Sequence, residues 1–153
     1  MACHAMRGRA GRLALCSLAV WIVLGSMVTG CSNDPASTGI PPEPTFSAIQ
    51  QEIFAKSCAF SSCHGADGQR GGLVLEGNNV YDALVGVRPE DTTARGLGFL
   101  RVMPGKPDSS FLLRKVVGPG PGEGTRMPDG LGALEQTSID AIREWIRRGA
   151  HRD

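Results

Sequence analysis

The sequence has little net charge and few aromatic residues. Its 16 basic and 15 acidic residues nearly cancel, and no basic patch stands out, which argues against nucleic acid as a partner. Aromatic residues make up 5% of the chain, so large side chains that could fill a core are scarce. The 21 glycines and 10 prolines leave long loops between short apolar segments. Short segments of this kind cannot close a good core unaided.

The chain also lacks an apolar run long enough for a typical membrane span, which needs about twenty residues. Its main apolar run, residues 13–28, is shorter, and it follows Arg7, Arg9 and Arg12. Small residues follow the run. This order is typical of an export signal, so residues 1–30 are expected to be a signal peptide. A retained membrane anchor is the alternative interpretation.

Residues 28–31, with the sequence Val-Thr-Gly-Cys, resemble a bacterial lipobox. The resemblance implies a lipoprotein in which Cys31 becomes the first residue of the mature chain and carries the lipid. Its acyl chains would anchor the protein to the outer or inner membrane. An ordinary signal sequence is the alternative. Removal of the three arginines of the signal would leave 13 basic against 15 acidic residues, a net charge of about −2.

Composition and periodicity divide the remaining chain into a linker and one small domain. Residues 31–44 are rich in Ser, Pro and Gly, which predicts a flexible linker. Apolar residues from Phe46 onward then recur at helical spacing behind Thr45, a suitable capping residue. This pattern predicts a helix that runs directly into Cys58. The domain is expected to span residues 45–153.

The domain is predicted to be all-α with long loops. A capping box that begins at Thr137 predicts a final helix, and Gly149 is suited to end it. Glycine-rich segments separate the other elements and are expected to be loops. Two shorter helices are expected at residues 80–85 and 111–117, with caps at Asn79 and at Asp108 or Ser109.

Two cysteines remain after the signal peptide and the lipidated residue are set aside. Cys58 and Cys63 lie in the segment CAFSSCH, and His64 follows directly. Free thiols do not persist in an oxidising compartment, so this pair is expected to be bonded to something. A covalent haem site usually reads Cys-x-x-Cys-His, but here four residues separate the thiols.

Three interpretations of this segment are open. A Cys58–Cys63 disulfide would close a short loop and gain roughly 2 kcal/mol, but it would leave His64 and the glycine-rich loops unexplained. A structural zinc site needs four ligands, and the one further candidate, His151, lies beyond the last predicted helix. In a haem site the thiols add to two vinyl groups and the histidine after the second cysteine reaches the iron. Such a large apolar cofactor would also complete the core.

A second iron ligand is available at two positions. Met103 and Met127 both precede proline, and a methionine thioether would raise the reduction potential and suit electron transfer. Met127 lies in a glycine-rich loop shortly before the last predicted helix, where the chain can approach a flat ring closely. We therefore favour Met127 as the distal ligand, with Met103 as the alternative.

Six short motifs occur in a fixed order along the domain. They are Ile53-Phe54, Cys-His-Gly at 63–65, Gly-Gly-Leu-Val-Leu at 71–75, Pro-Gly-Lys-Pro-Asp-Ser-Ser at 104–110, Met-Pro-Asp-Gly at 127–130 and Trp-Ile-Arg-Arg-Gly-Ala at 145–150. In this order, they resemble the small cytochrome c domains of exported bacterial proteins, including the planctomycete-type group. The resemblance implies a class I cytochrome c-like fold, with the first and last helices crossing beside one covalently bound haem c. It also implies that Cys58 and Cys63 hold the haem, with His64 as proximal and Met127 as distal iron ligand.

The expected function is single-electron transfer by a lipid-anchored monohaem cytochrome in the periplasm or another extracytoplasmic site. Its partners would be redox proteins and, through the lipid, the membrane. A fully ligated iron leaves no position for a substrate, so no enzyme activity is expected. The alternative is a non-haem exported lipoprotein with a Cys58–Cys63 disulfide that acts as a binding or structural module. An iron without Met127 would instead allow peroxide chemistry.

Two features depart from the family pattern. The four-residue spacing needs a bulge ahead of Cys63, and a single thioether at Cys63 would result if Cys58 did not reach its vinyl group. In class I cytochromes a proline carbonyl often accepts the ring N–H of the proximal histidine, but no proline lies between His64 and Pro89. Another carbonyl must therefore orient the ring, and the sequence does not identify it.

Overall fold

The computed structural model describes residues 44–153 of the chain. The signal peptide expected at 1–30, the lipidated Cys31 and all but the last residue of the expected linker lie outside the described residues. Within residues 44–153 the regular elements are helices, and no strand forms. Two isolated bridges pair short pieces of extended backbone, Val85 with Val102 and Leu100 with Ser110. No helix in this part of the chain is long and apolar enough to cross a membrane.

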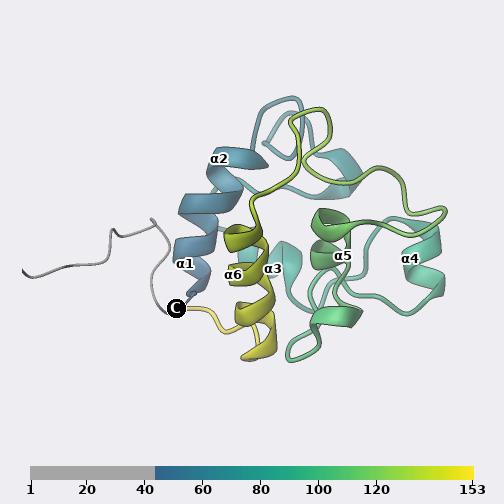
Figure 1. Ribbon diagram of the computed structural model, residues 1–153. Helices are drawn as coiled ribbons and strands as arrows, with labels where there is room; N and C mark the ends of the chain where they lie inside the picture. Colours follow the sequence, from purple (N-terminus) through teal and green to yellow (C-terminus); the bar gives the residue numbers. More distant parts are fainter. Residues whose placement is uncertain (1–43) are drawn as a thin grey trace, which may run out of the picture. The chain divides into compact units, whose positions relative to one another are not determined.

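The first helical segment forms where the sequence predicts it. α1 (Phe46–Ile49), the π-helical turn η1 (Gln50–Phe54) and α2 (Ala55–Ser57) follow one another without a break (Figure 1). Thr45 caps the segment, because its hydroxyl accepts a hydrogen bond from the Ala48 backbone N–H at 3.2 Å. The apolar stripe that predicts the helix is buried, so this segment contributes one wall of the core.

The last helix, α6 (Gln136–Arg147), begins earlier than the capping box predicts. Glu135 takes the cap position with extended backbone, and the first turn closes on its carbonyl oxygen. Thr137 therefore lies inside the first turn, and its assignment as the cap is wrong. The predicted end is confirmed, since Arg148 is the C-cap and Gly149 follows with a φ of +105°. That backbone conformation favours glycine.

Two shorter helices lie in the middle of the chain, as predicted. They are α3 (Val80–Leu84) and α5 (Phe111–Val117). Asn79 is the N-cap residue of α3, as predicted, although its side chain makes no capping hydrogen bond. The N-cap residue of α5 is Ser110, so the cap predicted at Asp108 or Ser109 is wrong. The latter two residues belong to a 3₁₀ turn that ends just before α5.

Three short elements fall in segments that were expected to be loops. They are η2 (Arg70–Gly72), α4 (Thr92–Gly96) and η3 (Pro107–Ser109). Asp91 caps α4, because its carboxylate accepts a hydrogen bond from the Ala94 N–H at 2.8 Å. Ala94 is the one buried residue of this helix, so no apolar stripe of helical period marks it in the sequence.

The first and last helices pack together. α1 contacts α6, and α6 also contacts α5, so α6 lies between the other two in Figure 1. The Phe46 ring meets Tyr81 edge to face at 5.2 Å between centroids and lies 5.6 Å from the Trp145 ring. Such pairs add about 0.5–1.5 kcal/mol beyond their buried area. The Tyr81 hydroxyl donates to the Ala150 carbonyl oxygen at 2.8 Å, which ties α3 to the end of α6.

A buried ion pair holds the long loop between α5 and α6. The Glu123 side chain is 0% exposed, and its Oε2 accepts hydrogen bonds from Arg114 Nε at 2.5 Å and from the Gly120 N–H at 2.6 Å. The next residue of α5, Lys115, donates from Nζ to the carbonyl oxygens of Glu123, at 2.9 Å, and Thr125. The hydrogen bond from Arg114 is the main cause that holds the pKa of Glu123 below its usual value. An ionised carboxylate therefore attaches the loop to α5.

Thr45→Ala and Thr137→Ala form a matched test of the two helix starts. Thr45→Ala removes a capping acceptor and should lower the free energy of unfolding by about 1 kcal/mol. Thr137→Ala places a better helix former at an exposed position inside α6, so it should leave the free energy unchanged or raise it slightly. Urea unfolding followed by circular dichroism measures both. A loss at Thr137 as large as the loss at Thr45 would contradict the observed start of α6.

The Glu123 ion pair predicts a specific acid dependence of stability. The pKa of Glu123 in the folded chain is lower than the ordinary 4.5. Its contribution is therefore complete above that ordinary value and is lost as the pH falls through the lower folded pKa. Glu123→Gln should lower the free energy of unfolding at neutral pH, and this deficit should shrink below about pH 4. Urea unfolding across this pH range measures the effect, with the exposed Glu135→Gln as the control. Parallel profiles for the wild type and Glu123→Gln would show that the carboxylate is not held ionised.

Candidate functional site

The segment CAFSSCH closes on itself at the end of α2. The backbone N–H of His64 donates to the Cys58 carbonyl oxygen at 3.2 Å, and that of Cys63 donates to the Phe60 carbonyl oxygen at 2.8 Å. The residues between the cysteines therefore form a compact turn whose ends, Cys58 and His64, are joined directly. Phe60, within this turn, is 43% exposed. The turn corresponds to the bulge expected from the four-residue spacing.

Gly68 allows the chain to pass close behind this turn. A Cβ atom at this position would lie 2.6 Å from the carbonyl oxygens of Cys63 and Ser61, and 2.8 Å from the backbone nitrogen of Cys63. All three are backbone atoms, which cannot move aside as a flexible side chain would. A glycine is therefore required at position 68 by this close approach.

A backbone carbonyl further along the chain fixes the ring of His64. His64 Nδ1 lies 3.2 Å from the Leu73 carbonyl oxygen, and the Leu75 N–H donates to the His64 carbonyl oxygen at 2.7 Å. When Nδ1 donates to Leu73, Nε2 keeps its lone pair. Burial lowers the pKa of His64, which favours the neutral, metal-binding form. Leu73 thus supplies the orienting carbonyl that the sequence does not identify.

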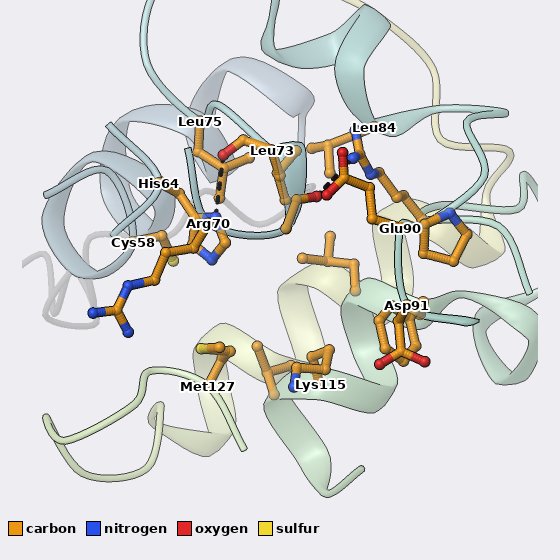
Figure 2. Close-up of a pocket in the computed structure, with 16 residues that line it drawn as sticks. Cys58, His64, Arg70, Leu73, Leu75, Leu84, Glu90, Asp91, Lys115 and Met127 are labelled. Atoms are coloured by element: carbon orange, nitrogen blue, oxygen red, sulfur yellow. Dashed lines mark hydrogen bonds between the residues drawn. The ribbon is translucent and has the colours of Figure 1, made fainter. Parts of the chain in front are cut away.

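A cavity of about 210 Å³ opens beside His64. Figure 2 shows His64 on one side of the open space and Met127 on the opposite side. A second cavity of about 20 Å³ shares four lining residues with the first. The apolar wall of the larger cavity consists of Leu73, Leu75, Leu84, Phe111, Leu112 and Val116. This wall comes mainly from the segment after η2, from the end of α3 and from α5.

The structure brings the four residues of the expected haem site to these two cavities. Cys58, His64 and Met127 line both of them, and Cys63 lines the smaller one. The four residues lie up to 69 positions apart in the sequence, so the fold rather than local sequence gathers them. The sequence does not identify the apolar wall residues as cavity residues. Leu73 and Leu75 belong to the Gly-Gly-Leu-Val-Leu motif after the histidine, and the others lie in the two predicted middle helices.

The two candidate distal ligands have different surroundings. The Met127 N–H donates to the Lys115 carbonyl oxygen at 2.8 Å, and its peptide bond to Pro128 is cis. Met103 lines neither cavity, and its N–H donates to Ser110 Oγ at 2.9 Å. Of the two methionines, Met127 is therefore the one that lies across the cavity from the histidine.

Cys58 and Cys63 are both free thiols in the structure. Burial, and to a lesser extent the neighbouring Cys63, raises the pKa of Cys58 from 9.0 to about 11. The Cys58 thiol is therefore protonated at neutral pH, and it packs against the hydrophobic core as a small apolar side chain. Thiolate reactions such as disulfide exchange are suppressed at this position.

Charged side chains line the cavity at more than one place (Figure 2). Arg70 lies beside Cys58 and His64, whereas Glu90 and Asp91 lie at the far end. Arg101 and Lys115 also line it. The Arg101 guanidinium donates to three backbone carbonyl oxygens at 2.9–3.0 Å, and burial lowers its pKa. The middle of the cavity is therefore apolar, with the Cys58 thiol and Arg70 at one end and two carboxylates at the other. Its apolar wall suits a flat apolar ligand.

The fourth residue of the zinc interpretation lies elsewhere. His151 follows α6, where its carbonyl oxygen accepts a hydrogen bond from Trp145 Nε1 at 2.9 Å, and it does not line the cavity beside His64. Among residues 44–153, no three or more His, Cys, Asp and Glu side chains are grouped so that they could hold a metal ion. Comparisons with protein-family models, with curated proteins and with solved structures found no match for this chain.

Gly68→Ala tests the close approach behind the CAFSSCH turn. Because its Cβ atom would meet backbone atoms, the substitution should lower the free energy of unfolding by roughly 1–3 kcal/mol. Gly96→Ala is the matched control, since nothing lies within 4 Å of a Cβ atom at that position in α4. It should leave the free energy unchanged or raise it slightly. Chemical unfolding of the two variants measures the difference, and equal effects would show that Gly68 is not constrained by its neighbours.

Proposed function

We propose that this chain is a lipid-anchored monohaem c-type cytochrome that transfers single electrons outside the cytoplasmic membrane. The observation that carries the proposal is the placement of His64 and Met127 on opposite sides of one apolar cavity. Cys58 and Cys63 lie at the edge of the same site. A histidine, a methionine and two thiols are the groups that a c-type haem uses for its axial ligands and its thioether bonds.

The residues present fit such a group. The cavity wall is apolar, as a porphyrin ring requires, and the ring of His64 is held so that Nε2 remains available. Cys58 lies at one end of the cavity, where a vinyl group would be attached, and three cations, Arg70, Arg101 and Lys115, line the cavity and would offset the charge of the haem carboxylates. The haem, when bound, would supply the chemistry of the reaction, a one-electron change at iron.

The protein would adjust the redox behaviour through three groups of its own. The Leu73 carbonyl oxygen fixes the imidazole of His64 and makes it a more basic ligand. The thioether of Met127 would favour the reduced state and so raise the reduction potential. The leucine-rich wall limits water near the site, which acts in the same direction. His64 and Met127 would together hold the iron and would leave no position for a substrate, so we propose electron transfer and no enzyme activity.

Packing of the terminal helices supports a class I cytochrome c-like arrangement. α1 and α6 are in contact, and the first helical segment leads directly into the turn that carries Cys58. The lipid anchor at Cys31 and the extracytoplasmic location rest on the sequence of residues 1–31 alone. Redox proteins that reach the edge of the haem would be the partners.

Expression together with cytochrome c maturation machinery tests the proposal. The purified chain should keep its haem after extraction with acidified acetone, because thioether bonds are covalent. The oxidised protein should show the far-red absorption band of a methionine–iron bond. Met127→Ala should abolish that band, whereas Met103→Ala, the matched control, should keep it. The spectrum of the haem in alkaline pyridine then distinguishes two thioether bonds from a single one at Cys63.

Two results would overturn parts of the proposal. If the wild-type chain carries no covalent haem, the non-haem module with a Cys58–Cys63 disulfide replaces the cytochrome. If it carries covalent haem without the far-red band, Met127 is not a ligand, and an iron with an open position for peroxide chemistry replaces the electron carrier.

A further inference from the structure

The loop that carries Met127 is attached to α5 by two consecutive cations. Arg114 Nε donates to Glu123 Oε2 at 2.5 Å, and Lys115 Nζ donates to the carbonyl oxygens of Glu123, at 2.9 Å, and Thr125. The Lys115 carbonyl oxygen in turn accepts the Met127 N–H at 2.8 Å. The loop backbone at Glu123, Thr125 and Met127 is therefore bonded to Lys115, and the Glu123 side chain is bonded to Arg114. Both partners are consecutive residues of α5.

Glu123 is held as a buried ion at a cost in free energy. Its side chain is 0% exposed, and Oε1 has no hydrogen-bond partner among the described residues. Burying a carboxylate with an unpaired oxygen opposes folding. The hydrogen bond from the Gly120 N–H to the Glu123 side chain closes a turn, and a neutral acceptor is sufficient for such a bond. This bond therefore does not explain why Glu123 is charged. The attachment to Arg114 does account for it, because a charge-assisted hydrogen bond fixes both distance and direction.

The helix that receives this attachment also forms part of the cavity. Phe111, Leu112, Lys115 and Val116 of α5 all line it, whereas Arg114 and Glu123 line neither of the two cavities that contain His64 and Met127. The ion pair therefore lies outside the site. Its hydrogen bonds hold the loop on α5 and so set where the loop stands relative to the cavity wall.

We propose that the Glu123–Arg114 ion pair positions Met127, by holding residues 118–127 on α5 so that the thioether faces His64 across the cavity. This rests on the proposed function, because Met127 is an iron ligand only in the haem-loaded protein. Glu123 and Arg114 are positioning residues, and neither touches the reacting atoms. Without the pair the loop moves away from α5 more often, and the iron position opposite His64 becomes open to other ligands.

The test uses the haem-loaded, full-length chain with Glu123→Ala, Arg114→Ala and the double variant. Imidazole competes with Met127 for iron, so its affinity reports how firmly the loop holds the thioether. Each single variant should bind imidazole roughly tenfold more tightly than the wild type and show a weaker far-red band. The double variant should show no larger effect than either single one, because the two side chains act as a unit. Glu123→Gln, which keeps an acceptor but loses the charge, should be intermediate.

A second ion pair provides the matched control. Arg147 and Glu144 pair at 2.6 Å on α6, with 63% and 39% of their side chains exposed, and neither lines the cavity. Glu144→Ala and Arg147→Ala should leave the imidazole affinity and the far-red band unchanged.

The outcomes separate positioning from simple stabilisation. If Glu123→Ala and Arg114→Ala lower the thermal stability but bind imidazole as the wild type does, the ion pair only stabilises the fold and the proposal is wrong. If Glu123→Ala yields no folded protein, Arg114→Ala and Glu123→Gln decide by the same two readouts. A wild-type chain that carries no covalent haem would overturn the proposed function instead, so the two failures are distinguishable.

Discussion

The hydrogen bond between His64 Nδ1 and the Leu73 carbonyl oxygen is the contact on which the site depends. An imidazole free to rotate would present Nε2 in several directions, whereas this contact leaves one. The segment that contains Leu73 makes a second contact with the histidine, since the Leu75 N–H donates to the His64 carbonyl oxygen. The histidine is thus held through its ring and through its backbone. The end of α2, which carries Cys58, and the segment that carries Leu73 are both fixed relative to it.

The sequence predicts those parts of the fold whose cause is local. The apolar stripe that starts at Phe46 and the one that contains Trp145 repeat at helical spacing, and both helices are present. Helix starts are less predictable, because several neighbouring residues compete for each one. Thr45 is a cap, but Glu135 takes the place expected for Thr137 through its backbone alone. The short α4 has no stripe and could not be found from periodicity.

The residues of the candidate site likewise fall into those that the sequence predicts and those that it does not. Cys58, Cys63, His64 and Met127 could be selected from the sequence because thiol, imidazole and thioether groups are suited to holding a haem, and the fold gathers them around adjoining cavities. The role of Leu73 could not be predicted from the sequence, because Leu73 acts through its backbone carbonyl group, which every residue has. Buried ion pairs and cavity walls depend on which segments meet in space, and spacing along the chain does not reveal that.

The turn between Cys58 and Cys63 has a consequence for how haem sites of the proposed type are recognised. The Cys58 carbonyl oxygen accepts a hydrogen bond from the His64 N–H, so the intervening residues form a turn whose two ends are held together. This bond, rather than a two-residue spacing between the thiols, holds Cys58 and His64 together. A search pattern that demands two residues between the thiols would pass over this chain. A pattern built on Cys-His-Gly, followed by the glycine pair and the leucine that supplies the carbonyl, would not.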